Sequence, residues 1–182
     1  LSTRRVRVEP HSPRLVRIAR AGLVLPLAYL ASYHWSPYDF SFAPEQVAEG
    51  VRRLMTIPFL GYYSGPEFGA FTEMARKSLL AVPLGVVLSM AWPLAPGERT
   101  LTSTRRLVLL GCAFVALCGI EVGQVFLPTR YPDTTDAFIG EIGVAAGLWL
   151  TTRILGTTHM AEHDGAPAGP ALAREAADRP RA

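Results

Sequence analysis

Five polar residues follow an apolar run that carries no charge between Leu107 and Ile120. A carboxylate in such a place can act as an acid or a base, and an arginine can hold an anionic group through paired hydrogen bonds. The types and spacing therefore suggest a polar site for a charged ligand. We interpret two of these residues as candidate catalytic groups and three as candidate ligand-binding groups: Glu121 and Asp136, then Gln124, Arg130 and Asp133.

The same residues allow two other interpretations. Asp133 and Asp136 offer oxygens to a divalent cation, but two carboxylates without a histidine are a weak metal signal, so we predict no metal ligand. In a structural interpretation, Asp133 caps a helix, Asp136 lies in its first turn, and Glu121 pairs with Arg130. The sequence identifies no cofactor. No nucleophile is evident either, which favours binding over covalent catalysis.

The elements that position this cluster are apolar segments of membrane-spanning length. About 20 mostly apolar residues cross roughly 30 Å of hydrocarbon. Four segments meet or approach this length: 21–35, 79–95, 107–127 and 137–155. We predict an all-α, polytopic membrane helical bundle with about four transmembrane helices in a lipid bilayer. The alternative is a soluble protein with buried core helices.

A short turn joins the last two predicted spans. Glu121 and Gln124 are three residues apart and share one helix face near the end of the third span. The chain breaks at Pro128 and restarts near Asp133, so the two helices must be antiparallel neighbours, and glycines on both permit a close approach. The turn therefore brings the polar residues together, with Glu141 as a further candidate. Because a buried carboxylate needs a partner, we expect Glu121 to meet the arginine of the turn.

Residues 36–77 form the longest connection between predicted spans. The stretches 45–59 and 70–77 alternate charged and apolar residues at roughly helical spacing, which predicts two short amphipathic helices at the membrane surface. Tyr62, Tyr63 and Phe68 are candidate interfacial anchors. An ordinary loop is the alternative.

Arginines predict the orientation in the membrane. Six of them precede the first span and three lie between the second and third, so both regions should be cytoplasmic and the turn at 128–136 should face outward. The positions of Arg76 and Lys77 do not fit this orientation, because both residues flank the second span on its outer side. The basic residues form no patch with interleaved aromatics, so we expect no nucleic-acid binding. Residues 159–163 spell HMAEH, an inverted zinc-peptidase order, but no packed domain follows to supply a further ligand.

The polar cluster resembles the VanZ-like family of bacterial membrane proteins. The family's ordered pattern is matched over 23 residues by Glu121, Gln124, Phe126, Pro128, Arg130, Asp133, Asp136 and Gly143. Looser similarity occurs at 37–40, 57–59 and 83–85. One position departs from the pattern: the family usually has asparagine where this chain has Gly140, so a hydrogen bond of that amide is missing or supplied differently.

The resemblance implies a small integral membrane protein of the bacterial envelope. Together with the four apolar segments and the arginines, we expect a multi-pass protein of the bacterial inner membrane with a cytoplasmic N-terminus. The name-giving member is associated with reduced susceptibility to the glycopeptide teicoplanin, a form of antibiotic resistance. We expect this chain to bind or help modify an anionic lipid-linked or cell-wall component. A membrane enzyme acting on a lipid phosphate and a structural, partner-binding module are the alternatives. The chain divides into a basic cytoplasmic arm (1–17), a VanZ-like membrane domain (18–156) and a disordered cytoplasmic tail (157–182).

Overall fold

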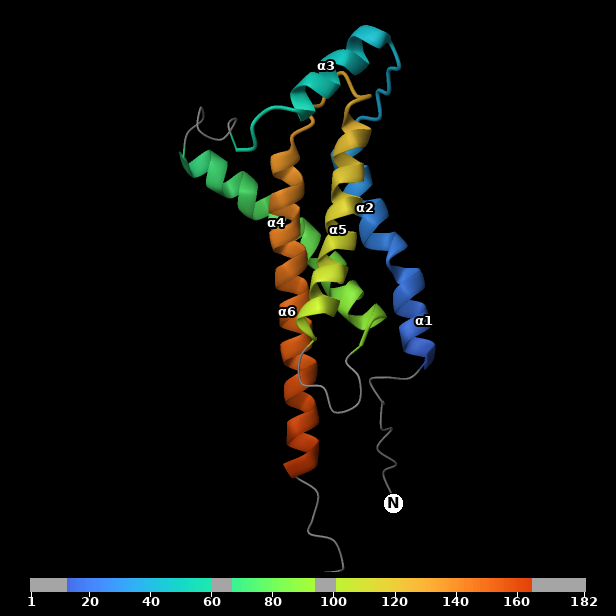
Figure 1. Cartoon of the computed structure of the whole chain (residues 1–182), viewed down its shortest axis with the longest axis vertical. Helices are drawn as coiled ribbons and strands as arrows, with labels where there is room; N and C mark the ends of the chain where they lie inside the picture. Colours follow the sequence, from blue (N-terminus) through green and yellow to red (C-terminus); the bar gives the residue numbers. More distant parts are fainter. Residues whose placement is uncertain (1–12, 60–66, 94–100, 165–182) are drawn as a thin grey trace, which may run out of the picture.

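The computed structural model of the chain describes residues 13–59, 67–93 and 101–164. Within these ranges the chain forms six helices and no strand, which confirms the predicted all-α fold (Figure 1). In chain order they are α1 (Pro13–Gly22), α2 (Val24–Trp35), α3 (Pro44–Leu54), α4 (Glu67–Ala91), α5 (Ser103–Gln124) and α6 (Thr134–Asp164).

Four helical segments are long and apolar enough to cross a membrane, as predicted. They are Pro13–Trp35, which joins α1 and α2, then Gly69–Ala91, Ser103–Gln124 and Thr134–Ile154. The first begins earlier than the sequence suggested, because α1 continues almost directly into α2. The break between them is explained by Pro26, which has no N–H to donate to the carbonyl of Gly22.

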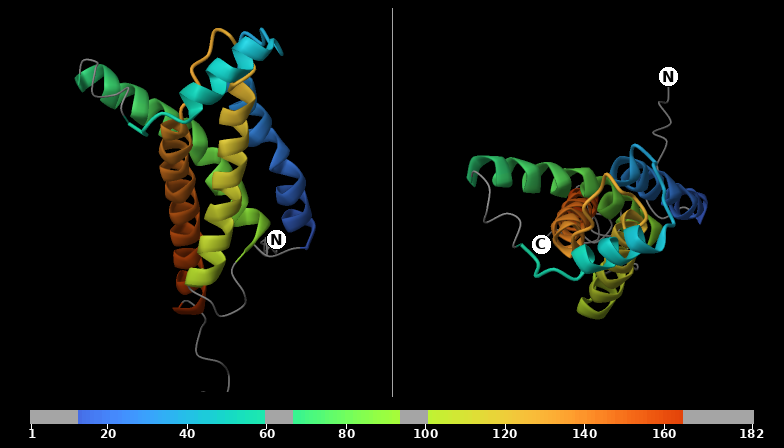
Figure 2. Two further views of the ribbon diagram at one scale, coloured as in Figure 1. Left: turned by 45° about the horizontal axis from the view of Figure 1, so that its top comes forward. Right: turned by 90° about the horizontal axis from the view of Figure 1, so that it is seen from above.

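The region between the first two spans differs from the prediction. Helix α3 is present and lies across one end of the bundle (Figures 1 and 2). The predicted second surface helix is wrong, because residues 70–77 are the first part of the continuous helix α4. No glycine or proline interrupts that stretch, so the helix propagates into the apolar segment. Of the proposed anchors, Tyr62, Tyr63 and the side chain of Phe68 lie outside the described residues.

Helices α4 and α6 make the most extensive contact in the bundle, although they are not neighbours in sequence. They cross at a steep angle, as both views show (Figures 1 and 2). Glycines on both helices place backbone against backbone: a Cβ added at Gly143 would overlap the carbonyl of Ser78, and one at Gly85 would overlap the carbonyl of Val144. The glycines of the last span were predicted to permit the close approach of another helix, and two of them, Gly143 and Gly147, face the second span.

Helix α6 extends beyond the predicted membrane domain. It continues to Asp164, so the boundary placed at residue 156 falls inside a helix, and the HMAEH stretch lies on it. At the other end, α1 begins at Pro13, within the predicted arm. Residues 1–12 and 165–182 lie outside the described residues.

One end of the bundle gathers the end of α2, helix α3 and the turn at 125–133; we call it the α3 end (Figure 1). Most basic side chains of this end and of the first part of α4 contact an acidic one. The pairs are Arg52 and Arg53 with Glu49, Arg76 with Glu73, and Lys77 with Asp136. The hydrogen bond from Arg53 lowers the pKa of the Glu49 carboxyl. These acids offset the positive charge that seemed out of place at this end.

Candidate functional site

Glu121 lies on the last turn of α5 and is almost completely buried, with 2% of its surface exposed. It contacts His34, at the end of α2: the imidazole Nδ1 lies 3.3 Å from the Glu121 Oε1 atom. The predicted pair between Glu121 and Arg130 is wrong. The histidine approaches from the neighbouring helix, whereas the arginine side chain turns toward the end of α2 instead.

The second carboxylate oxygen of Glu121 is held by nitrogen donors. The Gln124 amide donates a hydrogen bond of 2.8 Å to Oε2, and the backbone N–H of Asp133 donates another of 3.4 Å. The same Gln124 amide nitrogen lies 3.1 Å from His34 Nδ1. Glu121 and Gln124 therefore share one helix face, as their spacing predicted, and the start of α6 meets them.

Asp133 occupies the capping position that the structural interpretation assigned to it. Its Oδ1 accepts hydrogen bonds from the backbone N–H of Thr135 at 2.8 Å and from the Thr135 hydroxyl at 2.6 Å. The Thr135 oxygen in turn accepts from the backbone N–H of Phe59 at 2.7 Å, which ties the segment after α3 to α6. These hydrogen bonds satisfy a free N–H group at the start of α6, so Asp133 is a helix-capping residue here.

Asp136 is bound by a lysine that the sequence analysis did not connect with the cluster. Lys77 of α4 contacts both carboxylate oxygens of Asp136, at 2.7 and 2.6 Å, and lies 3.7 Å from Glu73 one turn earlier on its own helix. The close crossing of α4 and α6 brings these residues together. The pattern offered no signal for this contact, because the two helices are far apart in sequence.

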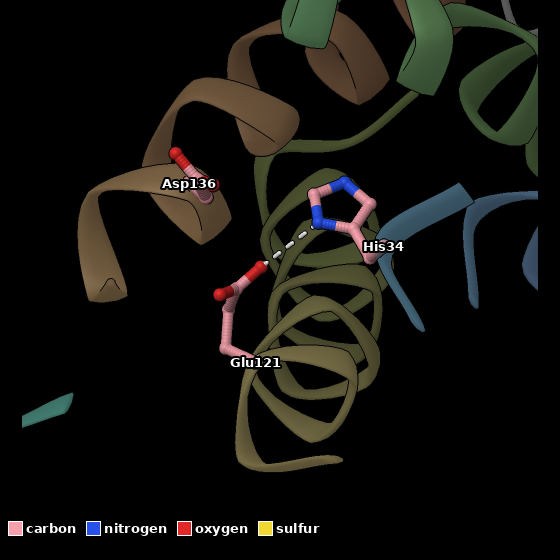
Figure 3. A group of neighbouring side chains, drawn as sticks. All are labelled: His34, Glu121 and Asp136. Carbon is pink, nitrogen blue, oxygen red and sulfur yellow. Dashed lines mark ion pairs between the residues drawn. The ribbon is translucent and has the colours of Figure 1, made fainter. Parts of the chain in front are cut away.

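His34, Glu121 and Asp136 surround a small hollow (Figure 3). Each contributes one nitrogen or oxygen atom, and these three atoms lie within 4.8 Å of one another. The hollow is about large enough for one water molecule. Lys77 and Gly140 also line it, so the position where the family usually carries asparagine has no amide here.

Arg130 lies apart from this hollow. Its Nε donates to the carbonyl of Ser36 at 2.5 Å, and its terminal nitrogen lies 3.5 Å from the carbonyl of Tyr33. No carboxylate of the described residues forms an ion pair with it. It borders an open groove whose other walls are hydroxyl-bearing residues at the end of α2: Tyr29, Ser32, Tyr33, Ser36 and Tyr38.

Glu141 does not join the cluster that we expected it to enter. Both of its carboxylate oxygens are buried and have no hydrogen-bond partner in the described part of the chain. The predicted site residues thus separate into three groups. Glu121, Gln124 and Asp136 surround or support the hollow, Arg130 borders the groove, and Asp133 caps α6.

The arrangement contains two residues that sequence reasoning missed, His34 and Lys77. A signal for the histidine was present: it is a polar residue at the end of an apolar span, at the same end as Glu121. Chemically, a buried carboxylate against an imidazole is suited to moving a proton or to binding a cation.

A family model described as VanZ/LLP1 matches residues 21–155, which include the hollow, the groove and most of the four candidate spans. No curated protein and no solved structure matches the chain. The match covers well over half of the sequence, and the chain therefore belongs to the VanZ/LLP1 family.

Proposed function

We propose that this multi-pass membrane protein lies in the bacterial inner membrane with its N-terminus in the cytoplasm. We further propose that its α3 end faces outward and binds an anionic group of a lipid-linked or cell-wall component. The observation that carries the proposal is Arg130, whose guanidinium has no acidic partner among the described residues and borders an open groove.

The first support is the charge of this guanidinium. An arginine that is fixed but not neutralised is suited to a phosphate or carboxylate, because its fork of N–H groups matches their oxygens. Arg130 is held by backbone carbonyls of Ser36 and Tyr33, which fix its position without cancelling its charge. Less conformational entropy is then lost when a ligand binds.

The second support is the wall of the groove. Tyr29 and Tyr38 are half exposed, at 52% and 51%, so each places part of an aromatic ring at the surface near the end of a membrane span. Tyr38 has a φ of 68°, which is uncommon for an aromatic residue, and its hydroxyl donates to the carbonyl of Ser32 at 3.1 Å. Strained residues of this kind are often found at ligand sites. A groove with an aromatic wall and one cation suits an amphipathic lipid phosphate.

A second candidate function is catalysis on the same kind of lipid phosphate, with Glu121 and Asp136 as the catalytic groups. The buried contact of Glu121 with His34 favours it, because an imidazole can pass a proton to or from a carboxylate. Under this alternative, Glu121→Gln abolishes turnover while the amount of folded protein in the membrane stays normal.

The binding proposal is tested by native mass spectrometry of the detergent-purified protein. Wild type, Arg130→Ala and Arg130→Lys are compared with Arg52→Ala, which removes an exposed cation at the same end of the bundle but away from the groove. Each protein is also titrated with undecaprenyl phosphate in nanodiscs. We expect Arg130→Ala to lose the bound anionic lipid, Arg130→Lys to retain part of it, and Arg52→Ala to match wild type.

Equal lipid retention by folded Arg130→Ala and wild type would overturn the proposal. Loss of lipid in Arg52→Ala as well would show that only general positive charge is required, which also contradicts a specific groove. Teicoplanin susceptibility of cells producing each variant gives a separate biological readout of the family association.

A further inference from the structure

We propose that His34, Glu121 and Asp136 form a binding site for one divalent transition-metal ion of the Zn²⁺ or Mn²⁺ class. The site lies at the hollow between α2, α5 and α6 (Figure 3). This inference does not depend on the groove at Arg130. It also departs from the sequence analysis, which considered the two aspartates and no histidine.

The ligand types and their spacing support the site. One imidazole and two carboxylates from three separate helices converge, with one donor atom of each within 4.8 Å of the others. His34 Nδ1 and Glu121 Oε1 are 3.3 Å apart. Two ligands bound tetrahedrally to one metal at about 2.0–2.2 Å are about 3.3–3.6 Å apart. One pair of ligands therefore already has the required separation, and Asp136 must move closer to the other two to complete the site.

The surroundings hold Glu121 as a metal site requires. Its Oε2 accepts hydrogen bonds from the Gln124 amide and from the backbone N–H of Asp133, which leaves Oε1 directed at His34. Such supporting hydrogen bonds commonly orient ligating carboxylates. The carboxylate is also buried, so water competes weakly for it, and the adjacent hollow has about the volume of one water molecule, enough for a bare ion.

Two groups oppose a metal ion: the Gln124 amide nitrogen, which lies 3.1 Å from His34 Nδ1 and must move aside, and Lys77. The Lys77 ammonium contacts both oxygens of Asp136, so an incoming cation must displace it. Glu73 offers an alternative partner, because it already lies 3.7 Å from the same ammonium. The ammonium and the metal therefore compete for one carboxylate, and removing the lysine should strengthen metal binding. A merely structural cluster does not predict that result.

The test uses the full chain without a polyhistidine tag. His159 and His163 are replaced by alanine in every sample, because the HMAEH stretch could bind metal on its own. Zn²⁺ and Mn²⁺ are titrated by calorimetry, and the bound metal is counted by elemental analysis after dialysis. We expect one ion per chain, and a fall in affinity of about tenfold or more in Glu121→Gln and in Asp136→Asn.

Glu141→Gln is the matched control. It removes a buried carboxylate from the same helix as Asp136, at a position outside the cluster, and it should bind metal as the parent does. Lys77→Gln should bind more tightly than the parent. Helical content and elution from a sizing column confirm that each variant is folded.

The proposal is overturned if the parent chain binds neither metal, or if Glu121→Gln and Asp136→Asn bind as tightly as Glu141→Gln does. If one of the ligand variants fails to fold, X-ray absorption of the Zn²⁺-loaded parent decides. A first shell with one imidazole nitrogen and carboxylate oxygens supports the site, and a shell of water oxygens alone refutes it.

Discussion

Replacing Gly143 with alanine should separate helices α4 and α6 and destabilise the protein. An added Cβ would overlap the carbonyl oxygen of Ser78, lie 2.8 Å from its carbonyl carbon and lie 3.2 Å from the Cβ of Ala81. The first two atoms belong to the backbone of a helix, so no side-chain rotation relieves the clash. The helices themselves must move apart.

The expected cost follows from that displacement. Overpacking a close contact typically costs about 1–3 kcal/mol of folding free energy. The cost should lie toward the upper part of this range, because the neighbouring residues Ala81 and Val144 are completely buried and lose contact as well. In lipid, packing of this kind is the main force that holds apolar helices together. The displacement would also draw Lys77, the neighbour of Ser78, away from Asp136.

Reversible unfolding of the purified protein in mixed micelles of mild detergent and SDS measures this cost. Gly119→Ala is the matched control: it lies on α5, its added Cβ meets nothing within 4 Å, and alanine favours the helix by up to about 1 kcal/mol. Gly143→Ala should therefore unfold at a lower SDS fraction than wild type, and Gly119→Ala at the same or a higher fraction. Equal stability of the two variants would refute the backbone contact between α4 and α6.

Four further predictions concern the α3 end. Trp35→Phe should lose about 0.5–1.5 kcal/mol in the same unfolding assay, because the indole N–H donates to a backbone carbonyl of α5 at 2.9 Å. Asp133→Ala should cost about 0.5–2 kcal/mol through the lost cap of α6, and Asp133→Asn should recover most of it. Because Arg53 lowers the pKa of Glu49, this pair stabilises α3 above the ordinary carboxyl pKa and stops doing so as the pH falls through the lowered value. Hydrogen exchange of the α3 amides, corrected for the intrinsic rate, should show this dependence in wild type and not in Glu49→Gln. A cysteine replacing Tyr131, which is 72% exposed, in a chain without native cysteines should react with an impermeant thiol reagent on intact cells, whereas labelling only after lysis would reverse the proposed orientation.

The transmembrane helices could be predicted because their signal is local. Each span is a continuous apolar segment, and its length alone indicates a membrane helix. The residues at which the helices begin and end were harder to predict from the sequence. The merging of residues 70–77 into α4 depends on how a short amphipathic stretch meets an apolar one, and helical propensity decided it in favour of one long helix.

The partners within the cluster were not predictable by the same reasoning. A short turn indicated correctly that α5 and α6 are adjacent, so the approach of Asp133 to Glu121 followed from the sequence. The choice of partner for Glu121 depended on α2, which is distant in sequence, and proximity along the chain wrongly favoured Arg130. The contact of Lys77 with Asp136 could not be predicted either, because it depends on α4, which is also distant in sequence from α6. The glycines of α6 indicated a close helix contact but not which helix would make it.

The charged cluster also explains how four apolar spans obtain a defined arrangement. Helices in lipid gain little from hydrophobic burial against one another, so polar contacts and close packing must select the partners. Each span supplies one of four residues: His34, Lys77, Glu121 and Asp136. The contact of His34 with Glu121 connects α2 to α5, and the ion pair of Lys77 with Asp136 connects α4 to α6. The structural and functional interpretations of these residues are therefore compatible: the contacts that align the spans at the α3 end also place an imidazole and two carboxylates around one hollow.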